Sequence, residues 1–406
     1  MVIQHTYNSG VRLVIDTLPY RQSVSMGIYV GNGSRNEKPE QAGISHFIEH
    51  MLFKGTKTRT AQDIASEMDL LGGQLNAYTT REYTCFYARV LNDNFEIAAD
   101  ILADMFFNSK FDEKDIEQEA KVIVEEINMY EDTPDDLVYD QLQIGIWKND
   151  NALGRPILGT AEKVKSYKAK NFAKYMFNHY RPDNTVLAVA GNIEAQRTID
   201  FFGKYFDTPW QCGSEEPLQR AEYQPYSVRK EKDIEQTHLC MTYEGIPIGS
   251  KFAYDMNVFN TIFGGSMSSR LYQSIREKNG LAYAIYSHFS CYRDNGIYTI
   301  YAGVGTGIEN KTMELILQEI EGLYSNKITE NDIERAKQQV KNNYLLSLDS
   351  TTNIIETLGR NMLLRNLVVE SDEVVEKVSK VTRESVYELI DLIFDKDKLS
   401  VSVVSG

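Results

Sequence analysis

A strand-like segment, Val186-Leu187-Ala188-Val189-Ala190-Gly191, recurs at the far end of the chain as Val401-Ser402-Val403-Val404-Ser405-Gly406. This repeat is the first indication of how the chain folds. Both copies are short runs of β-branched and small residues that end in glycine, a composition typical of buried strands. They lie 215 positions apart. Similarity within one chain at a fixed offset indicates that a folding unit has been duplicated.

Other matches keep nearly the same offset. Phe86-Tyr87-Ala88-Arg89-Val90 corresponds to Ile300-Tyr301-Ala302-Gly303-Val304 at an offset of 214, and Asp115-Ile116-Glu117 corresponds to Asp332-Ile333-Glu334 at 217. Chance matches among common residue types would not preserve their order along the chain. We therefore expect two homologous halves.

Each half alternates strand-like and helix-like segments. The aromatic and β-branched composition predicts strands at 84–91 and 296–304. Apolar residues at helical spacing predict helices at 94–109, 112–130, 309–324 and 329–348. This pattern predicts an α+β fold, with helices packed on mixed or antiparallel sheets.

A proline- and glycine-containing stretch separates the halves. Gly213, Pro217 and Pro225 lie in a polar segment typical of a linker. We therefore predict an N-terminal domain at 1–212, a linker at 213–225 and a C-terminal domain at 226–406.

Composition excludes several classes of partner. The chain has 406 residues, with 43 Lys and Arg against 58 Asp and Glu, a formal net charge of −15. Such a charge repels nucleic acid and anionic membranes, so we expect neither as a partner. The four cysteines form no CxxC pair, and the sequence shows neither a leader peptide nor a long apolar run. We therefore expect a cytoplasmic protein.

The segment that carries the chemistry contains His46, Glu49 and His50. Residues three and four positions apart share one face of a helix, so two imidazoles and a carboxylate converge there. Two neutral nitrogen ligands suit zinc, and Glu49 beside the ion could act as a general base. The alternative is a pair of core histidines, but the expected number of chance HxxEH matches is on the order of 0.01.

Two histidines and a water leave tetrahedral zinc one ligand short. The predicted helix at 112–130 offers Glu119, Glu125 and Glu126 among apolar residues, with Glu119 and Glu126 two turns apart on the same face. Composition does not decide which of them binds.

These residues resemble the inverzincin peptidases, the family of pitrilysin and the mitochondrial processing peptidases, over nearly the whole chain. Glu126 lies 76 residues beyond His50, where that family has its third zinc ligand. The resemblance implies that His46, His50 and Glu126 bind one Zn²⁺, that Glu49 is the general base and that Glu119 supports the site. It also implies a clamshell half built from the two domains.

The resemblance extends to residues that contact substrate. Asn76, Ala77 and Tyr78 resemble the family's edge strand, to which an extended peptide adds by main-chain hydrogen bonds. Arg276 and Tyr283 resemble a pair that holds substrate carbonyls and stabilises the developing oxyanion. On composition alone, an ordinary edge strand and a surface arginine are the alternatives.

An acidic pair, Asp136 and Asp140, resembles the groups with which processing peptidases bind a substrate arginine; a solvated acidic loop is the alternative. The second half lacks the metal ligands, because His46 and His50 correspond to Asn260 and Gly264, and Glu126 to Asn343. One zinc per chain is therefore expected, with the C-terminal domain gripping substrate.

The sequence thus predicts a zinc endopeptidase that cleaves unfolded peptides or basic, presequence-like segments. Because the chain holds two of the four modules of the family's large members, the resemblance implies a dimer, either a homodimer or a heterodimer. The alternatives are an inactive peptide-binding subunit of a heterodimeric peptidase and an S-ribosylhomocysteine lyase, whose HxxEH-like site is completed by cysteine. Lyase chains are much shorter and need no second half.

Overall fold

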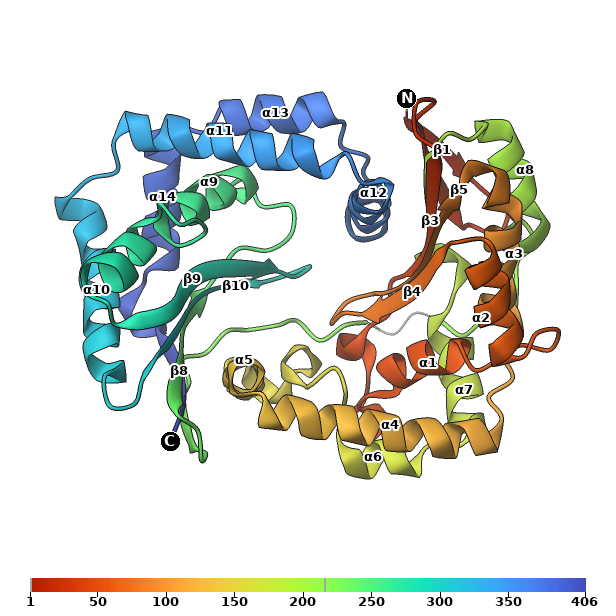
Figure 1. Ribbon diagram of the computed structural model, residues 1–406, viewed down its shortest axis with the longest axis horizontal. Coiled ribbons are helices and arrows are strands. Elements are labelled where there is room, and N and C mark those ends of the chain that lie inside the picture. Colours follow the sequence, from red (N-terminus) through yellow and green to blue (C-terminus); the bar gives the residue numbers. More distant parts are fainter. Residues whose placement is uncertain (1, 215–216) are drawn as a thin grey trace. The chain divides into compact units, whose positions relative to one another are not determined.

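Two β-sheets, one from each half of the chain, organise the protein (Figure 1). The computed structural model describes residues 2–214 and 217–406. Residues 215 and 216 of the predicted linker lie outside the described residues. Both sheets are mixed and both are packed with helices, which confirms the predicted α+β class.

The first sheet has six strands in the order β1-β2-β6-β3-β5-β4. They are β1 (Val2–Thr6), β2 (Arg12–Thr17), β3 (Ser23–Val30), β4 (Gln74–Thr79), β5 (Thr84–Leu91) and β6 (Thr185–Gly191). Only β2 and β6 run parallel, and β4 lies at an edge, paired with β5 alone.

The second sheet has five strands in the order β7-β11-β8-β10-β9. They are β7 (Ser227–Glu231), β8 (Gln236–Glu244), β9 (Ala282–Cys291), β10 (Gly296–Gly305) and β11 (Ser400–Ser405). If β6 is matched with β11, this order repeats β2-β6-β3-β5-β4 strand for strand, and the pair β7–β11 is again parallel. The topology therefore confirms the duplication.

Fourteen α-helices are described within residues 2–214 and 217–406. In the first half they are α1 (Ile44–Leu52), α2 (Ala61–Leu70), α3 (Phe95–Asn108), α4 (Glu113–Asp132), α5 (Pro134–Gly145), α6 (Ala161–Ser166), α7 (Ala169–His179) and α8 (Ala195–Phe206). In the second half they are α9 (Ala253–Phe263), α10 (Glu309–Ser325), α11 (Glu330–Ser347), α12 (Thr351–Arg365), α13 (Ser371–Ser379) and α14 (Arg383–Ile393).

The strands and helices predicted from composition and periodicity are confirmed, with ends that differ by a few residues. The predicted helix at 112–130 is α4 and that at 329–348 is α11, while the predicted strand at 84–91 is β5 without change. In the described part of the chain, no helix combines the length and apolar character that crossing a bilayer requires.

Two compact units interleave along the chain. The first comprises Met1–Ile127, Arg155–Gln219 and Ser347–Glu370. The second comprises Asn128–Gly154, Arg220–Leu346 and Ser371–Gly406. The units are not contiguous halves of the chain. The segment with α5 comes from the first half but belongs to the second unit, and the segment with α12 comes from the second half but belongs to the first unit, so the two helices are exchanged. The linker at 213–225 and its domain boundaries stay a prediction.

Each sheet therefore has one face covered by a helix from the other half of the sequence. In the first unit, α12 packs on β3, where Thr351 and Ser25 share a hydrogen bond of 2.8 Å. Gly359 allows this close approach, because a Cβ there would lie 2.4 Å from the Tyr29 ring. In the second unit, α5 packs on β11, and Gln141 donates to the Ser402 hydroxyl at 2.7 Å.

Candidate metal centre

The helix that carries the HxxEH motif is anchored at its N-terminus by the buried side chain of Glu37. Gly43 adopts a left-handed conformation (φ 84°) at the N-cap of α1, which suits glycine. The two oxygens of Glu37 accept hydrogen bonds of 2.8 Å from the backbone N–H groups of Gly43 and Ser45. Glu37 therefore satisfies donors that a helix end leaves unpaired. Burial raises the pKa of Glu37 to about 8, although these hydrogen bonds lower it.

The apolar face of α1 is buried in the core of the first unit through Phe47, Ile48, Met51 and Leu52. Helix α4 is likewise fixed by Ile116, Ile123 and Val124. These contacts direct the polar face of α1 towards α4, which presents Glu119 and Glu126 from one face.

His46, His50 and Glu126 form the one cluster of potential metal ligands found in the described residues, with ligand atoms all within 4.8 Å of one another. Glu126 Oε2 lies 3.8 Å from His46 Nε2 and 3.7 Å from His50 Nε2, too far for hydrogen bonds. Two atoms bonded to one tetrahedral zinc at about 2.1 Å are roughly 3.4 Å apart. The spacing and the donor set therefore fit a zinc ion.

Glu119 fixes the orientation of the His50 ring. His50 Nδ1 lies 2.8 Å from Glu119 Oε1, and a carboxylate partner requires that Nδ1 carry the proton. The lone pair of His50 is then on Nε2, the nitrogen that faces Glu126. Carboxylates that orient histidine ligands in this way are common around metals.

The two histidines differ electrostatically. Burial, with a smaller contribution from the charge of His50, lowers the pKa of His46 to about 3, so His46 is a neutral imidazole. Burial also lowers the pKa of His50, but the hydrogen bond and charge of Glu119, with the charges of Glu126 and Glu49, outweigh it and raise the pKa.

Glu49 lies beside the cluster and is held by the edge strand. Thr79 Oγ1 on β4 donates a hydrogen bond of 2.5 Å to Glu49 Oε2. Burial raises the pKa of Glu49, and this hydrogen bond opposes the rise. The carboxylate therefore has one oxygen engaged by Thr79, while Oε1 can accept a proton.

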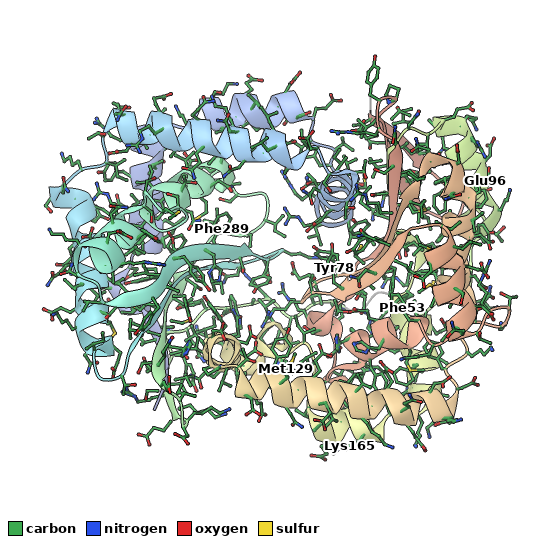
Figure 2. All side chains as sticks on the ribbon, viewed as in Figure 1. Phe53, Tyr78, Glu96, Met129, Lys165 and Phe289 are labelled. Carbon is green, nitrogen blue, oxygen red and sulfur yellow. The ribbon has the colours of Figure 1, made fainter. Side chains whose placement is uncertain are left out.

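The residues predicted to bind peptide lie on β4, immediately before Thr79. Asn76 is exposed, whereas Ala77 and Tyr78 are half-buried. Tyr78, which is labelled in Figure 2, packs edge-on against Tyr83 and Tyr87. Among the residues that the structure describes, β4 pairs with β5 on one side and with no strand on the other, so its outer backbone edge is at the border of the sheet. An extended peptide could add there.

The remaining predicted residues belong to the second unit, and their roles stay predictions. Arg276 lies in the π-helical turn η7 (Tyr272–Lys278), with its guanidinium 5.0 Å from the centre of the Tyr272 ring. Tyr283 lies on β9 and is 67% exposed. Asp136 and Asp140 are one turn apart on α5, where burial and the charges of Asp135 and Asp140 raise the pKa of Asp136.

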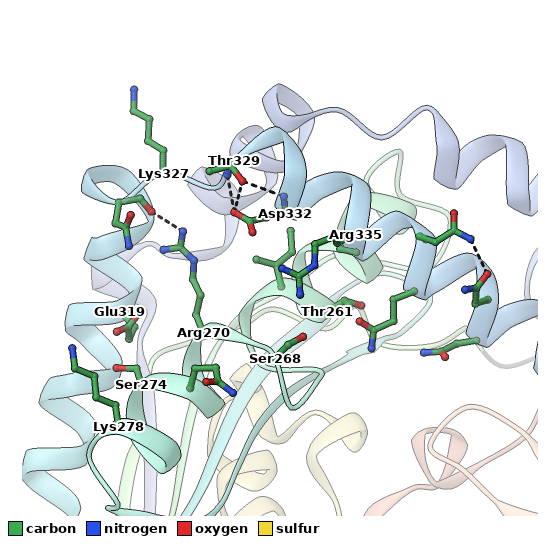
Figure 3. Close-up of a pocket in the computed structure, with 18 residues that line it drawn as sticks. Thr261, Ser268, Arg270, Ser274, Lys278, Glu319, Lys327, Thr329, Asp332 and Arg335 are labelled. Carbon is green, nitrogen blue, oxygen red and sulfur yellow. Dashed lines mark hydrogen bonds between the residues drawn. The ribbon is translucent and has the colours of Figure 1, made fainter.

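In the second unit, one of the positions that match the metal cluster, Asn343, lines a cavity of about 930 Å³ (Figure 3). Ala336 and Asn343, which match Glu119 and Glu126, are part of its wall, together with the cationic Arg270 and Arg335. Alanine cannot ligate a metal, and arginine repels cations. The loss of the metal ligands from the second half stays a prediction from the sequence.

Sequence reasoning missed three residues that support the site: Thr79, Glu37 and Lys54. Lys54 Nζ forms an ion pair of 2.5 Å with Glu119 Oε2. Its spacing of four residues from His50 is a signal that could have placed it next to the histidines. For Glu37 and Thr79, no pattern in the sequence points to their contacts with α1.

Comparison with protein-family models gives two matches that together span most of the chain. Residues 12–161 match the model described as Insulinase (Peptidase family M16). Residues 166–340 match the model described as Peptidase M16 inactive domain.

Curated proteins from several bacteria are similar over nearly the full length. A Bacillus subtilis protein named uncharacterized zinc protease YmxG is 42% identical over 397 residues, which cover 98% of this chain and 97% of that protein. A Rickettsia felis protein named uncharacterized zinc protease is 37% identical, covering 98% of this chain and 96% of its own.

Two solved structures share the fold. A structure described as a protease from Helicobacter pylori superposes with a TM-score of 0.92 at 18% identity, covering 100% of this chain and 99% of that one. A peptidase M16 inactive domain from Pseudomonas fluorescens gives a TM-score of 0.93 at 17% identity, covering 100% and 98%.

Proposed function

Because the chain belongs to the insulinase family of peptidases, family M16, we propose that it is a zinc-dependent endopeptidase that cleaves extended peptides. The observation that carries the proposal is the convergence of His46, His50 and Glu126, with Glu49 beside them. The names of the relatives, zinc proteases, support the choice of metal.

His46, His50 and Glu126 would hold the ion. A bound zinc would act as a Lewis acid towards the scissile carbonyl. Glu49 then takes a proton from the attacking water at Oε1 and delivers it to the leaving amine. Thr79 keeps the carboxylate in place through both transfers, because it holds Oε2.

The substrate in this proposal is an unfolded segment. Asn76, Ala77 and Tyr78 would pair with its backbone, which requires an extended conformation. Arg276 and Tyr283 would hold substrate carbonyls and the developing oxyanion, and Asp136 with Asp140 would favour basic residues. These four assignments rest on the family resemblance, as does the dimer.

A quenched fluorescent basic peptide, incubated with the zinc-loaded chain, tests this function. Zinc content is measured in parallel by mass spectrometry. We expect one zinc per chain and cleavage of the peptide, with Glu49→Gln losing cleavage while keeping its zinc. Glu126→Gln should lose zinc, whereas Glu125→Gln, an exposed neighbour on α4, should keep both zinc and cleavage.

Two results would contradict the proposal. Zinc bound without cleavage of any unfolded peptide would favour the alternative of a peptide-binding subunit. Cleavage that survives in Glu49→Gln would exclude the assigned general base.

A further inference from the structure

A chain of contacts leads from the end of α1 to the proposed metal site. Lys54 Nζ pairs with Glu119 Oε2 at 2.5 Å. Glu119 Oε1 lies 2.8 Å from His50 Nδ1. His50 Nε2 in turn faces Glu126 Oε2 at 3.7 Å. Each oxygen of the Glu119 carboxylate thus has a different partner, and one of these partners is a metal-ligand candidate.

Glu119 is only 4% exposed, so its charge needs both partners. A buried carboxylate that loses its counter-ion is costly, because water cannot replace the lost contact. Without the Lys54 side chain, the Glu119 carboxylate would be held by His50 alone, and the hydrogen bond that orients His50 would be less firmly fixed. Among the described residues, the Lys54 ammonium forms its ion pair with Glu119 and with none of the three candidate ligands.

Charge balance supports the same role. Glu49, Glu119 and Glu126 supply three carboxylates, and Lys54 supplies one ammonium, which pairs with Glu119. One divalent cation neutralises this set.

We propose that Lys54 is a positioning residue for the metal centre, which fixes the Glu119 carboxylate so that His50 presents Nε2 to the ion. The inference rests on the proposed zinc site and adds to it a residue outside the HxxEH motif. Lys54 touches neither ion nor substrate, and acts through Glu119.

If Lys54 acts only as a positive charge near the site, its removal should change the zinc affinity in the opposite direction. A positive charge repels zinc, so removing it would tighten zinc binding. Under the positioning account, removing it weakens binding, because substitutions of groups that orient ligands typically cost 10- to 100-fold in metal affinity.

The test is the Zn²⁺ dissociation constant of the full-length chain, measured by competition with a chromophoric chelator. Lys54→Met should weaken zinc binding about 10-fold or more. Lys54→Arg, which keeps the charge, should stay within about 3-fold of the parent chain, since an arginine also pairs with a carboxylate. Lys57→Met removes the same charge at an exposed position three residues away and should leave the constant unchanged.

A double-mutant cycle separates action through Glu119 from other effects. In the Glu119→Gln background, Lys54→Met should cause no further loss of zinc affinity. Circular dichroism in the presence of a chelator checks that each variant folds. If Lys54→Met does not fold, Lys54→Gln takes its place in the same cycle.

Tighter zinc binding by Lys54→Met, an unchanged constant, or an equal loss in the Glu119→Gln background would each overturn the inference. These outcomes presuppose that the parent chain binds zinc. A parent chain that binds none would instead refute the proposed function, so the two failures are distinguishable.

Discussion

Thr79 donates a hydrogen bond of 2.5 Å from its hydroxyl to Glu49 Oε2, which links the edge strand β4 to the candidate general base. The same strand carries the residues predicted to pair with peptide. The strand that would receive substrate therefore also orients the group that would activate water. Replacing Thr79 should therefore lower the turnover of peptide more than it changes the binding of peptide or zinc.

Replacing Thr79 with the isosteric valine removes the donor and keeps the shape. A hydrogen bond to a charged group contributes about 1.5–3 kcal/mol, so kcat should fall roughly 10- to 100-fold. KM and zinc content should change little, and Thr79→Ser should retain most of the turnover. Steady-state kinetics of the three chains on one peptide provide the check. An equal loss of kcat in Thr79→Ser and Thr79→Val would show that the hydroxyl does not contribute to turnover.

The buried ion pair between Arg35 and Glu82 ties the loop before α1 to the turn between β4 and β5. The pair is 2.7 Å long, and its side chains are only 2% and 4% exposed. Glu82→Gln removes the charged partner of Arg35 in this pair, and breaking a buried pair in this way costs about 3–5 kcal/mol. Urea unfolding monitored by circular dichroism measures the loss. A change below roughly 1 kcal/mol, the range of exposed pairs, would contradict the assigned role.

The raised pKa of Glu37 should make the stability of the folded chain depend on pH. Its pKa is about 8 in the folded chain, against 4.5 for an ordinary glutamate, so the folded state holds a proton that the unfolded state releases between these values. The stabilisation from Glu37 is therefore complete below about pH 4.5 and is lost as pH rises through about 8.

Urea unfolding of the parent chain and of Glu37→Gln, at pH 5 and again at pH 8.5, tests this linkage. Glutamine does not titrate, so the parent chain should lose stability relative to the variant between the two pH values. Parallel changes in the two chains would mean that Glu37 titrates alike in the folded and unfolded states.

Gly359 provides a test of the exchanged helix α12. A methyl group there would lie 2.4 Å from the Tyr29 ring, so Gly359→Ala should destabilise the first unit by about 1–3 kcal/mol. Gly322 on α10 has no neighbour within 4 Å of such a methyl group. Gly322→Ala should instead stabilise by about 0.5–1 kcal/mol, because alanine favours helices. Thermal unfolding of both variants tests whether Gly359→Ala lowers the stability and Gly322→Ala raises it.

Much of this fold could be predicted from the sequence, because the duplication makes the same pattern of strands and helices occur twice in one chain. The copies at 186–191 and 401–406 proved to be β6 and β11, and the sheet orders match. The exchange of α5 and α12 could not be predicted. Periodicity shows that a helix has an apolar face, but it does not show which sheet covers that face.

The same limit applies to the site. The spacing of His46, Glu49 and His50 on one helix follows from helical geometry, so their convergence could be predicted. The choice of Glu126 over Glu125 needed the family resemblance. Thr79 and Lys54 act through contacts between elements, and such contacts depend on packing that the sequence does not display.

The most direct measurement of the central claim is a crystal structure of the zinc-loaded chain with anomalous scattering recorded at the zinc edge. We expect one zinc peak per chain, with His46 Nε2, His50 Nε2 and a Glu126 oxygen each at about 2.0–2.2 Å from the ion. A zinc ion bound elsewhere, or bound to the two histidines with Glu126 turned away, would contradict it.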